Sequence, residues 1–197
     1  MFALVESGNI TQMPNGNKGI TLNGNQYPAS IYTLWTEAER NAINIYTITI
    51  DESKRKDEKW YINTNITYSF DGTNATGSYG DATAKAHADA NATDDDGVDL
   101  DPVIVIEGLK TKLIRKVKAQ AEGELNRTDW YITRKSEKDT AIPSAITTHR
   151  DAVRSKQDSM CTAITNASDT PALETLYTYT KQEDESVTRP LGEIPTL

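Results

Sequence analysis

Apolar and polar residues alternate through the N-terminal part of the chain, which is the period-two pattern of half-buried β-strands. Two short apolar runs flank Ser7, Gly8 and Asn9, and a Gly-Asn pair supplies the positive φ angles of a tight hairpin turn. Strands or strand pairs are predicted on this basis at residues 2–13, 19–22, 43–50 and 59–70. Residues 1–72 are therefore expected to form a small β-rich unit.

One short helix is predicted within this unit. Thr36 precedes the sequence Glu-Ala-Glu-Arg, and the carboxylates of Glu37 and Glu39 lie where the positive end of a helix dipole favours negative charge. Thr36 or Thr33 is therefore predicted as the N-cap. The helix is expected to end near Asn44.

The next stretch, residues 73–104, is small and polar and offers little apolar surface to bury. Such a sequence does not offset the entropy lost on ordering, so it is predicted to be an extended linker or arm. A weak helix is predicted over residues 82–90, because alanine has the highest intrinsic helix propensity.

Beyond this stretch the apolar period becomes helical. Leu109, Leu113, Val117, Ala121 and Leu125 recur every four positions, with lysines and arginines around the rest of the surface. This pattern predicts an amphipathic helix of about five turns. Further helix starts are predicted at Thr128 or Asp129, at Pro143 and at Asp169.

These patterns together predict an α+β fold. The β-rich unit and the polar arm are followed by an antiparallel helical hairpin over residues 105–167. Residues 168–197 are expected to form a short helix and an extended tail, because two prolines lie near the C-terminus.

Composition narrows the classes of partner. The chain has 197 residues and a formal net charge of -8, whereas nucleic-acid binding needs clustered lysine and arginine, so no nucleic acid is expected. No window reaches the roughly 18 to 20 apolar residues of a membrane-spanning helix, and no membrane partner is expected. The first residues turn polar too quickly for a signal peptide, so the chain is expected to be made in the cytoplasm.

An acidic run at residues 94–101 is the strongest metal candidate. Placing Gly97 at the sixth position of an EF-hand-type loop puts Ala92 at the first position and Val103 at the twelfth. Both positions need carboxylate ligands in such a loop. An acidic surface loop is therefore the favoured interpretation, and no metal site is predicted.

Residue types that perform catalysis form no recognisable motif. His87 and His149 have no metal-ligand spacing to other residues, and Cys161 has no histidine nearby in sequence. A Gly-x-Ser-x-Gly elbow and a phosphate-binding glycine loop are both missing. The chain is therefore predicted not to be an enzyme, with no catalytic residues and no cofactor.

A possible surface feature lies on the second predicted helix. Trp130, Arg134 and Glu137 share one helix face. They form either a ligand site or, as the favoured interpretation, a cation-π and salt-bridge lock between helices.

The segments "NQYPASIYTLWTEAERNAINIYTI" and "DWYITRKSEKDTAIPSAITTHRDAVR" carry a resemblance to a known family. The first is similar to a Tyr-Pro-Ala, aromatic and acidic-helix segment near the N-terminus of small bacteriophage tail and virion proteins. The second is similar to their C-terminal Asp-Trp-Tyr, Arg-Lys-x-Glu, Ile-Pro and Arg-x-x-Val-Arg pattern, which also occurs in tail-fibre assembly proteins. Asn44 stands where the family usually has Gly. The matching positions are Tyr27, Pro28, Ala29, Trp35, Glu39, Arg40, Asp129, Trp130, Arg134, Glu137, Pro143, Arg150 and Arg154.

The resemblance implies a non-enzymatic virion structural protein of the tail or the tail-fibre attachment region, made in the host cytoplasm. The alternatives are a tail-fibre assembly chaperone absent from the mature particle and a carbohydrate-processing or receptor-binding protein. Expected partners are other phage tail or fibre proteins and further copies of the chain, with a trimer as one arrangement. The residues predicted to make these contacts are Tyr27, Ile31, Trp35, Trp130, Arg134, Arg150 and Arg154.

Overall fold

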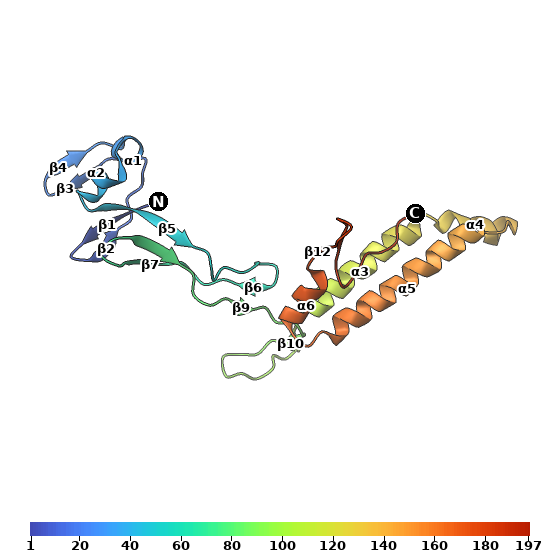
Figure 1. The fold of residues 1–197 in the computed structure, drawn as a ribbon. Helices are drawn as coiled ribbons and strands as arrows, with labels where there is room; N and C mark the ends of the chain where they lie inside the picture. The colour runs from blue at the N-terminus through green and yellow to red at the C-terminus, as the bar shows by residue number, and fades with distance from the viewer. The chain divides into compact units, whose positions relative to one another are not determined.

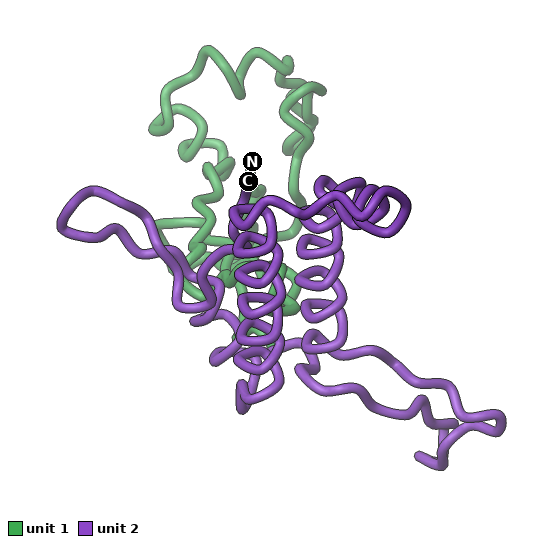
Figure 2. The backbone as a smooth tube through the Cα atoms, turned by 90° about the vertical axis from the view of Figure 1, so that its right-hand side faces the viewer, with its two compact units in different colours: residues 1–83 green, residues 84–197 purple.

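A computed structural model describes residues 1–197 and divides the chain into two compact units, Met1–Thr83 and Ala84–Leu197 (Figures 1 and 2). The first unit contains the main sheet and the second contains the long helices, so the predicted α+β class is confirmed. The first unit extends beyond the predicted end at residue 72, because a strand at Ala75–Ser78 belongs to its sheet.

The first unit is built on a sheet of five strands: β1 (Phe2–Glu6), β2 (Asn9–Gln12), β5 (Ile45–Asp51), β7 (Thr67–Phe70) and β8 (Ala75–Ser78). Their order is β2-β1-β5-β8-β7, and neighbours are antiparallel except β5 and β8, which are parallel. The edge strands β2 and β7 also approach each other, so the sheet is strongly curled. Curling reduces the free edge that the sheet offers for pairing.

The hairpin predicted over residues 2–13 is confirmed as β1 and β2. Ser7 and Gly8 have φ angles of 52° and 79°. Both residues lie in the left-handed region that a two-residue hairpin turn requires, so the local sequence sets the register of the pair.

Strand β1 lies between two apolar clusters. The Leu4 side chain packs with Ile31 and Ile45 in one cluster, and the neighbouring Ala3 packs with Ile48 in the other. Successive side chains of a strand point to opposite faces, so adjacent residues serve different clusters. β1 is therefore covered on both faces and forms the centre of the unit.

Two short helices, α1 (Ile31–Leu34) and α2 (Glu37–Asn41), follow a small hairpin of β3 (Ile20–Leu22) and β4 (Asn25–Tyr27). Thr36 caps α2, which confirms one of the two predicted caps. Its hydroxyl accepts the Glu39 N–H, and the Glu39 carboxylate accepts the Thr36 N–H at 2.7 Å. Asn44 ends the segment with a φ of 62°, a conformation that glycine adopts at lower cost.

The single strand predicted over residues 59–70 is wrong. The chain forms β6 (Tyr61–Ile62) and then β7, with a break between them. Asn63 lies in this break, where its Oδ1 accepts the Lys56 N–H and its Nδ2 donates to the Lys56 carbonyl, both at 2.9 Å. This side-chain pairing with the backbone replaces a strand ladder at that point.

The second unit contains four helices: α3 (Leu109–Asn126), α4 (Asp129–Lys138), α5 (Ser144–Asn166) and α6 (Thr170–Tyr177). Helices α3 and α5 run antiparallel side by side, which confirms the predicted hairpin (Figure 1). None of the helices combines the length and the apolar character that crossing a bilayer requires. The hairpin buries Leu113, Val117 and Ala121 of α3 against Ile146, Val153, Met160 and Ile164 of α5.

The weak helix predicted over residues 82–90 is wrong. The chain there is extended, with β9 (Thr83–Ala84) and then β10 (Ala90–Asn91). The N–H groups of Leu109 and Lys110 donate to the carbonyls of Ala86 and His87 at 2.9 and 3.0 Å. These carbonyls complete the first turn of α3, and this tertiary use outweighs the helix propensity of alanine.

The extended tail predicted after α6 is wrong in part. It contains a hairpin of β12 (Thr180–Lys181) and β13 (Val187–Thr188). Leu191 is only 3% exposed, and its N–H donates to the Leu176 carbonyl of α6 at 3.0 Å. Arg189 stacks over the rings of Tyr177 and Tyr179 and pairs with Glu193, so the tail is held against its own unit.

Candidate functional site

The predicted contact residues of the first unit belong to an aromatic cluster. The rings of Tyr27 and Trp35 are half-buried, with centroids 5.9 Å apart and planes at 87°. Ile31 is 0% exposed, so its predicted role as a contact residue is wrong. Helix α1 directs Ile31 into the core, while Leu34 at the end of the same helix is 79% exposed.

Arg40, one of the matching positions in the resemblance, holds this cluster together. Its guanidinium lies 5.4 Å from the centroid of the Phe2 ring and donates to the Trp35 carbonyl. A second guanidinium nitrogen lies 3.4 Å from Thr47 Oγ1 on β5. These contacts join α2 to the sheet, so Arg40 acts as a structural residue.

Arg150, a predicted contact residue of the second unit, is buried. Its Nη1 donates to the Leu125 carbonyl at 2.8 Å and to Thr128 Oγ1 at 2.6 Å, and lies 2.8 Å from Asp129 Oδ1. The Arg150 side chain is 9% exposed, so its predicted role in partner contacts is wrong. Arg154, one turn further along α5, is 50% exposed beside Asp151 and stays on the surface.

Trp130 and Arg134 form an exposed aromatic and cationic surface on α4. The Arg134 guanidinium lies 5.6 Å from the Trp130 ring centroid, and Trp130 is 51% exposed. Trp130 also packs on Tyr131, with ring centroids 3.9 Å apart. The cation-π contact is therefore internal to α4, whereas the sequence favoured a lock between helices.

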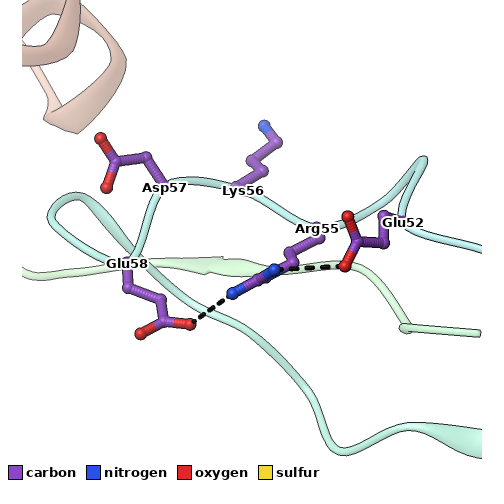
Figure 3. Close-up of a pocket in the computed structure, with 5 residues that line it drawn as sticks. All are labelled: Glu52, Arg55, Lys56, Asp57 and Glu58. Atoms are coloured by element: carbon purple, nitrogen blue, oxygen red, sulfur yellow. Dashed lines mark hydrogen bonds and ion pairs between the residues drawn. The ribbon is translucent and has the colours of Figure 1, made fainter. Parts of the chain in front are cut away.

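A cavity of about 470 Å³ lies in the first unit beside the loop after β5 (Figure 3). Arg55 pairs there with Glu52 at 3.2 Å and with Glu58 at 3.4 Å, and the hydrogen bond to Glu58 raises the pKa of Arg55. Lys56 and Asp57 point away from this group (Figure 3). The paired side chains are 44% to 72% exposed, so the cavity holds solvated charges in which one guanidinium is shared by two carboxylates.

Residue types with catalytic or metal-binding potential are dispersed. No three His, Cys, Asp or Glu side chains gather in a group that could hold a metal ion. Burial raises the pKa of the Cys161 thiol, which lowers the population of the reactive thiolate. In the acidic loop, Asp94 Oδ1 accepts the N–H groups of Asp96 and Val98 at 3.0 and 2.9 Å, so it stabilises the turn.

That acidic loop is the tip of a two-stranded arm formed by residues 90–106. Strand β10 pairs in antiparallel fashion with β11 (Val105–Ile106), and the arm, the pale green loop beside the β10 label, runs away from the helical hairpin (Figure 1). Four consecutive aliphatic side chains lie along its second strand, each more than half exposed. They are Val103 (59%), Ile104 (54%), Val105 (55%) and Ile106 (57%).

The base of the arm is fixed to α3. Asp89 Oδ1 accepts the Gly108 N–H, and its Oδ2 accepts the Thr111 hydroxyl, both at 2.8 Å. The Gly108 N-cap has no side chain of its own for this purpose, so Asp89 supplies the cap from across the arm. These hydrogen bonds lower the pKa of Asp89, with the Gly108 N–H as the largest cause.

Sequence reasoning missed the exposed aliphatic run of the arm. The pattern "VIVI" at residues 103–106 was a signal for it, because such a run is typical of a strand that is buried on both faces. Here all four side chains remain more than half exposed within the chain. The run is thus a candidate surface for contact with another protein subunit.

Comparisons with known proteins identify no relative of this chain. Scans of the chain against protein-family models, curated proteins and solved structures each find no match. The candidate site therefore rests on the geometry of the arm and on those predicted residues that are not buried. These are the half-buried Tyr27 and Trp35, together with Trp130, Arg134 and Arg154.

Proposed function

We propose that this protein is a non-enzymatic structural component of a bacteriophage virion, located in the tail or in the tail-fibre attachment region. The resemblance of two sequence segments to small phage tail and virion proteins motivates the assignment. The partners are other tail or fibre proteins, bound through surface contacts.

The arm at residues 90–106 is the observation that carries this proposal. An aliphatic strand exposed on one edge is costly to keep in water and is covered when a second protein adds a strand. The base of the arm is already ordered by Asp89 and Gly108, so binding loses less conformational entropy there. A subunit whose work is contact with other subunits needs such a surface.

Mass spectrometry of purified particles from a phage that encodes this chain tests the proposal. The expected result is the chain in stoichiometric amounts, with cross-links from the arm to a tail or fibre protein. Absence from finished particles would discard the structural role. Co-expression with the fibre protein then identifies an assembly chaperone, because a chaperone increases fibre solubility and leaves before the particle is complete.

A further inference from the structure

The arm presents free backbone groups as well as aliphatic side chains. The Ala92 N–H donates to the Ile104 carbonyl at 2.7 Å, so the backbone of Ile104 faces the first strand of the arm. In an antiparallel pair, successive residues alternate between facing the partner strand and facing away from it. The N–H and C=O groups of Val103 and Val105 therefore point to the outer edge.

Along residues 103–106 this outer edge lacks two of the usual protections against strand addition. Natural edge strands carry lysine, proline or a bulge, and residues 103–106 contain neither lysine nor proline. Pro102 and the irregular pairing before it, where the Leu100 N–H donates to the Ala92 carbonyl, limit the open edge to these four residues. A two-stranded hairpin alone is only marginally stable in water, and further strands stabilise it. The edge is therefore suited to receive another strand.

The charges of the arm limit which kind of partner strand can pair with this edge. The arm contains no lysine or arginine, so an anionic membrane or an acidic peptide would be repelled. Directly after the arm comes Glu107, whose carboxylate pairs with Arg115. The first turns of α3 then carry Lys110, Lys112 and Lys116, which leave this end basic. A strand with an acidic end and a basic end meets an identical strand favourably only when the two run in opposite directions. The acidic residues of the arm are Asp94, Asp95, Asp96, Asp99 and Asp101.

We propose that the outer edge of the arm pairs in antiparallel fashion with the same edge of a second copy of this chain, about a two-fold axis at Ile104. Val103 of each copy then forms a hydrogen-bonded pair with Val105 of the other, which satisfies the outward backbone groups of both. The antiparallel direction brings each acidic tip towards the basic start of α3 in the other copy. Parallel pairing would instead place the two acidic tips side by side.

The pairing is inferred from the geometry of the arm alone and does not depend on the proposed role in the virion. A homodimer in solution supports it whether or not the chain is found in particles. Conversely, a chain that is found in particles but stays monomeric in solution overturns only this inference.

Sedimentation equilibrium of the full chain over the micromolar range tests the pairing. The expected result is a monomer–dimer equilibrium that Val105→Pro weakens by about a hundredfold or more, because proline removes an outward N–H from each of two symmetric contacts. Proline there leaves the bonds within the arm intact, since this N–H points outwards. Circular dichroism should show an unchanged fold.

Val187→Pro provides a matched control on the other hairpin of the same unit. Val187 lies on β13 and is 59% exposed, against 55% for Val105. The Gln182 N–H donates to the Ser186 carbonyl at 2.8 Å, so the Val187 backbone also faces outwards. This variant should dimerise like the native chain.

Charge reversal tests the direction of pairing. Asp95→Lys combined with Asp96→Lys should weaken the dimer by about tenfold, and adding Lys112→Glu and Lys116→Glu should restore it. Hydrogen exchange should show protected amides at Val103 and Val105 only in dimeric samples. A native chain that stays monomeric throughout, a dimer that is insensitive to Val105→Pro, or reversal without restoration would each overturn the proposal.

Discussion

Arg150 of α5 and Asp129 of α4 form an ion pair in which Nη1 and Oδ1 lie 2.8 Å apart, and the same nitrogen donates to Leu125 and Thr128. One guanidinium thereby ties the end of α3, the start of α4 and the N-terminal third of α5 together. Arginine suits this position because its charge persists and its donors have a fixed geometry.

Replacing Arg150 should destabilise the helical unit. Arg150→Ala leaves the Thr128 hydroxyl and the Leu125 carbonyl without this donor, and we expect the free energy of unfolding to fall by about 2–4 kcal/mol. Arg154→Ala, one turn further along α5, should change it by less than about 0.5 kcal/mol because that ion pair is solvated. Urea unfolding followed by helical circular dichroism measures both, and equal losses would contradict the assigned role of Arg150.

Two glycines next to or within α3 should respond to alanine with opposite signs. A Cβ atom on Gly108 would clash with the backbone carbonyl of Ala88, whereas a Cβ atom on Gly123 would meet nothing within 4 Å. Gly108→Ala should therefore lower the free energy of unfolding by about 1–3 kcal/mol. Gly123→Ala should raise it by about 0.5–1 kcal/mol through helix propensity. Melting temperatures that shift in the same direction would refute the close approach at Gly108.

Helix α1 offers a similar pair in the first unit. Ile31 is 0% exposed and Leu34 is 79% exposed, although both are aliphatic residues of one short helix. Ile31→Ala should cost about 2–5 kcal/mol because it leaves a cavity between α1 and the sheet. Leu34→Ala should cost less than about 0.5 kcal/mol. Chemical unfolding followed by tryptophan fluorescence, with Trp60 and Trp130 replaced by Phe so that Trp35 alone is observed, reports both. A tolerated Ile31→Ala would restore that residue as a surface candidate.

The cap supplied by Asp89 predicts a pH dependence. Hydrogen bonds from Gly108 and Thr111 lower the pKa of this carboxyl below its ordinary value of 3.8. Because the folded pKa is the lower one, the stabilisation is complete above pH 3.8 and is lost as the pH falls through the folded pKa. Thr111→Val should raise the pKa of Asp89 in a carboxyl NMR titration. Asp71 of the first unit is the control: the N–H groups of Asn74 and Thr73 lower its pKa, which should stay unchanged. Equal titration of Asp89 in both proteins would contradict the cap.

Local signals in the sequence predicted the elements that local contacts hold. The apolar runs around Ser7, Gly8 and Asn9 predicted a hairpin, although the positive φ angles fall on Ser7 and Gly8 and not on the predicted Gly8 and Asn9. Thr36 indicated the cap of α2, and the four-residue spacing of Leu113 and Val117 indicated the buried face of α3. Each of these involves residues within one turn or one helix, so a single stretch of sequence contains the whole signal.

Contacts between distant residues explain what was not predicted. The carbonyl of Ala86 accepts the N–H of Leu109 of α3, and this contact holds the chain at Ala86 extended. Leu191 is buried where its N–H donates to the Leu176 carbonyl of α6. The same reason applies to Arg150, which looks like a surface cation until the end of α3 is placed beside it. Ile31 was misplaced because a four-residue helix is too short to display a period.

The hydrogen bond between Asp89 and Gly108 means that the arm leaves and rejoins its unit at neighbouring points. An excursion that closes on itself at the base can be lengthened, shortened or exchanged while the helices beneath it keep their packing, because the entropy of closing a loop grows only slowly with its length. The length of the arm can therefore vary under natural selection with little effect on folding. For the same reason, residues 90–106 are a suitable place to graft a foreign peptide onto this scaffold.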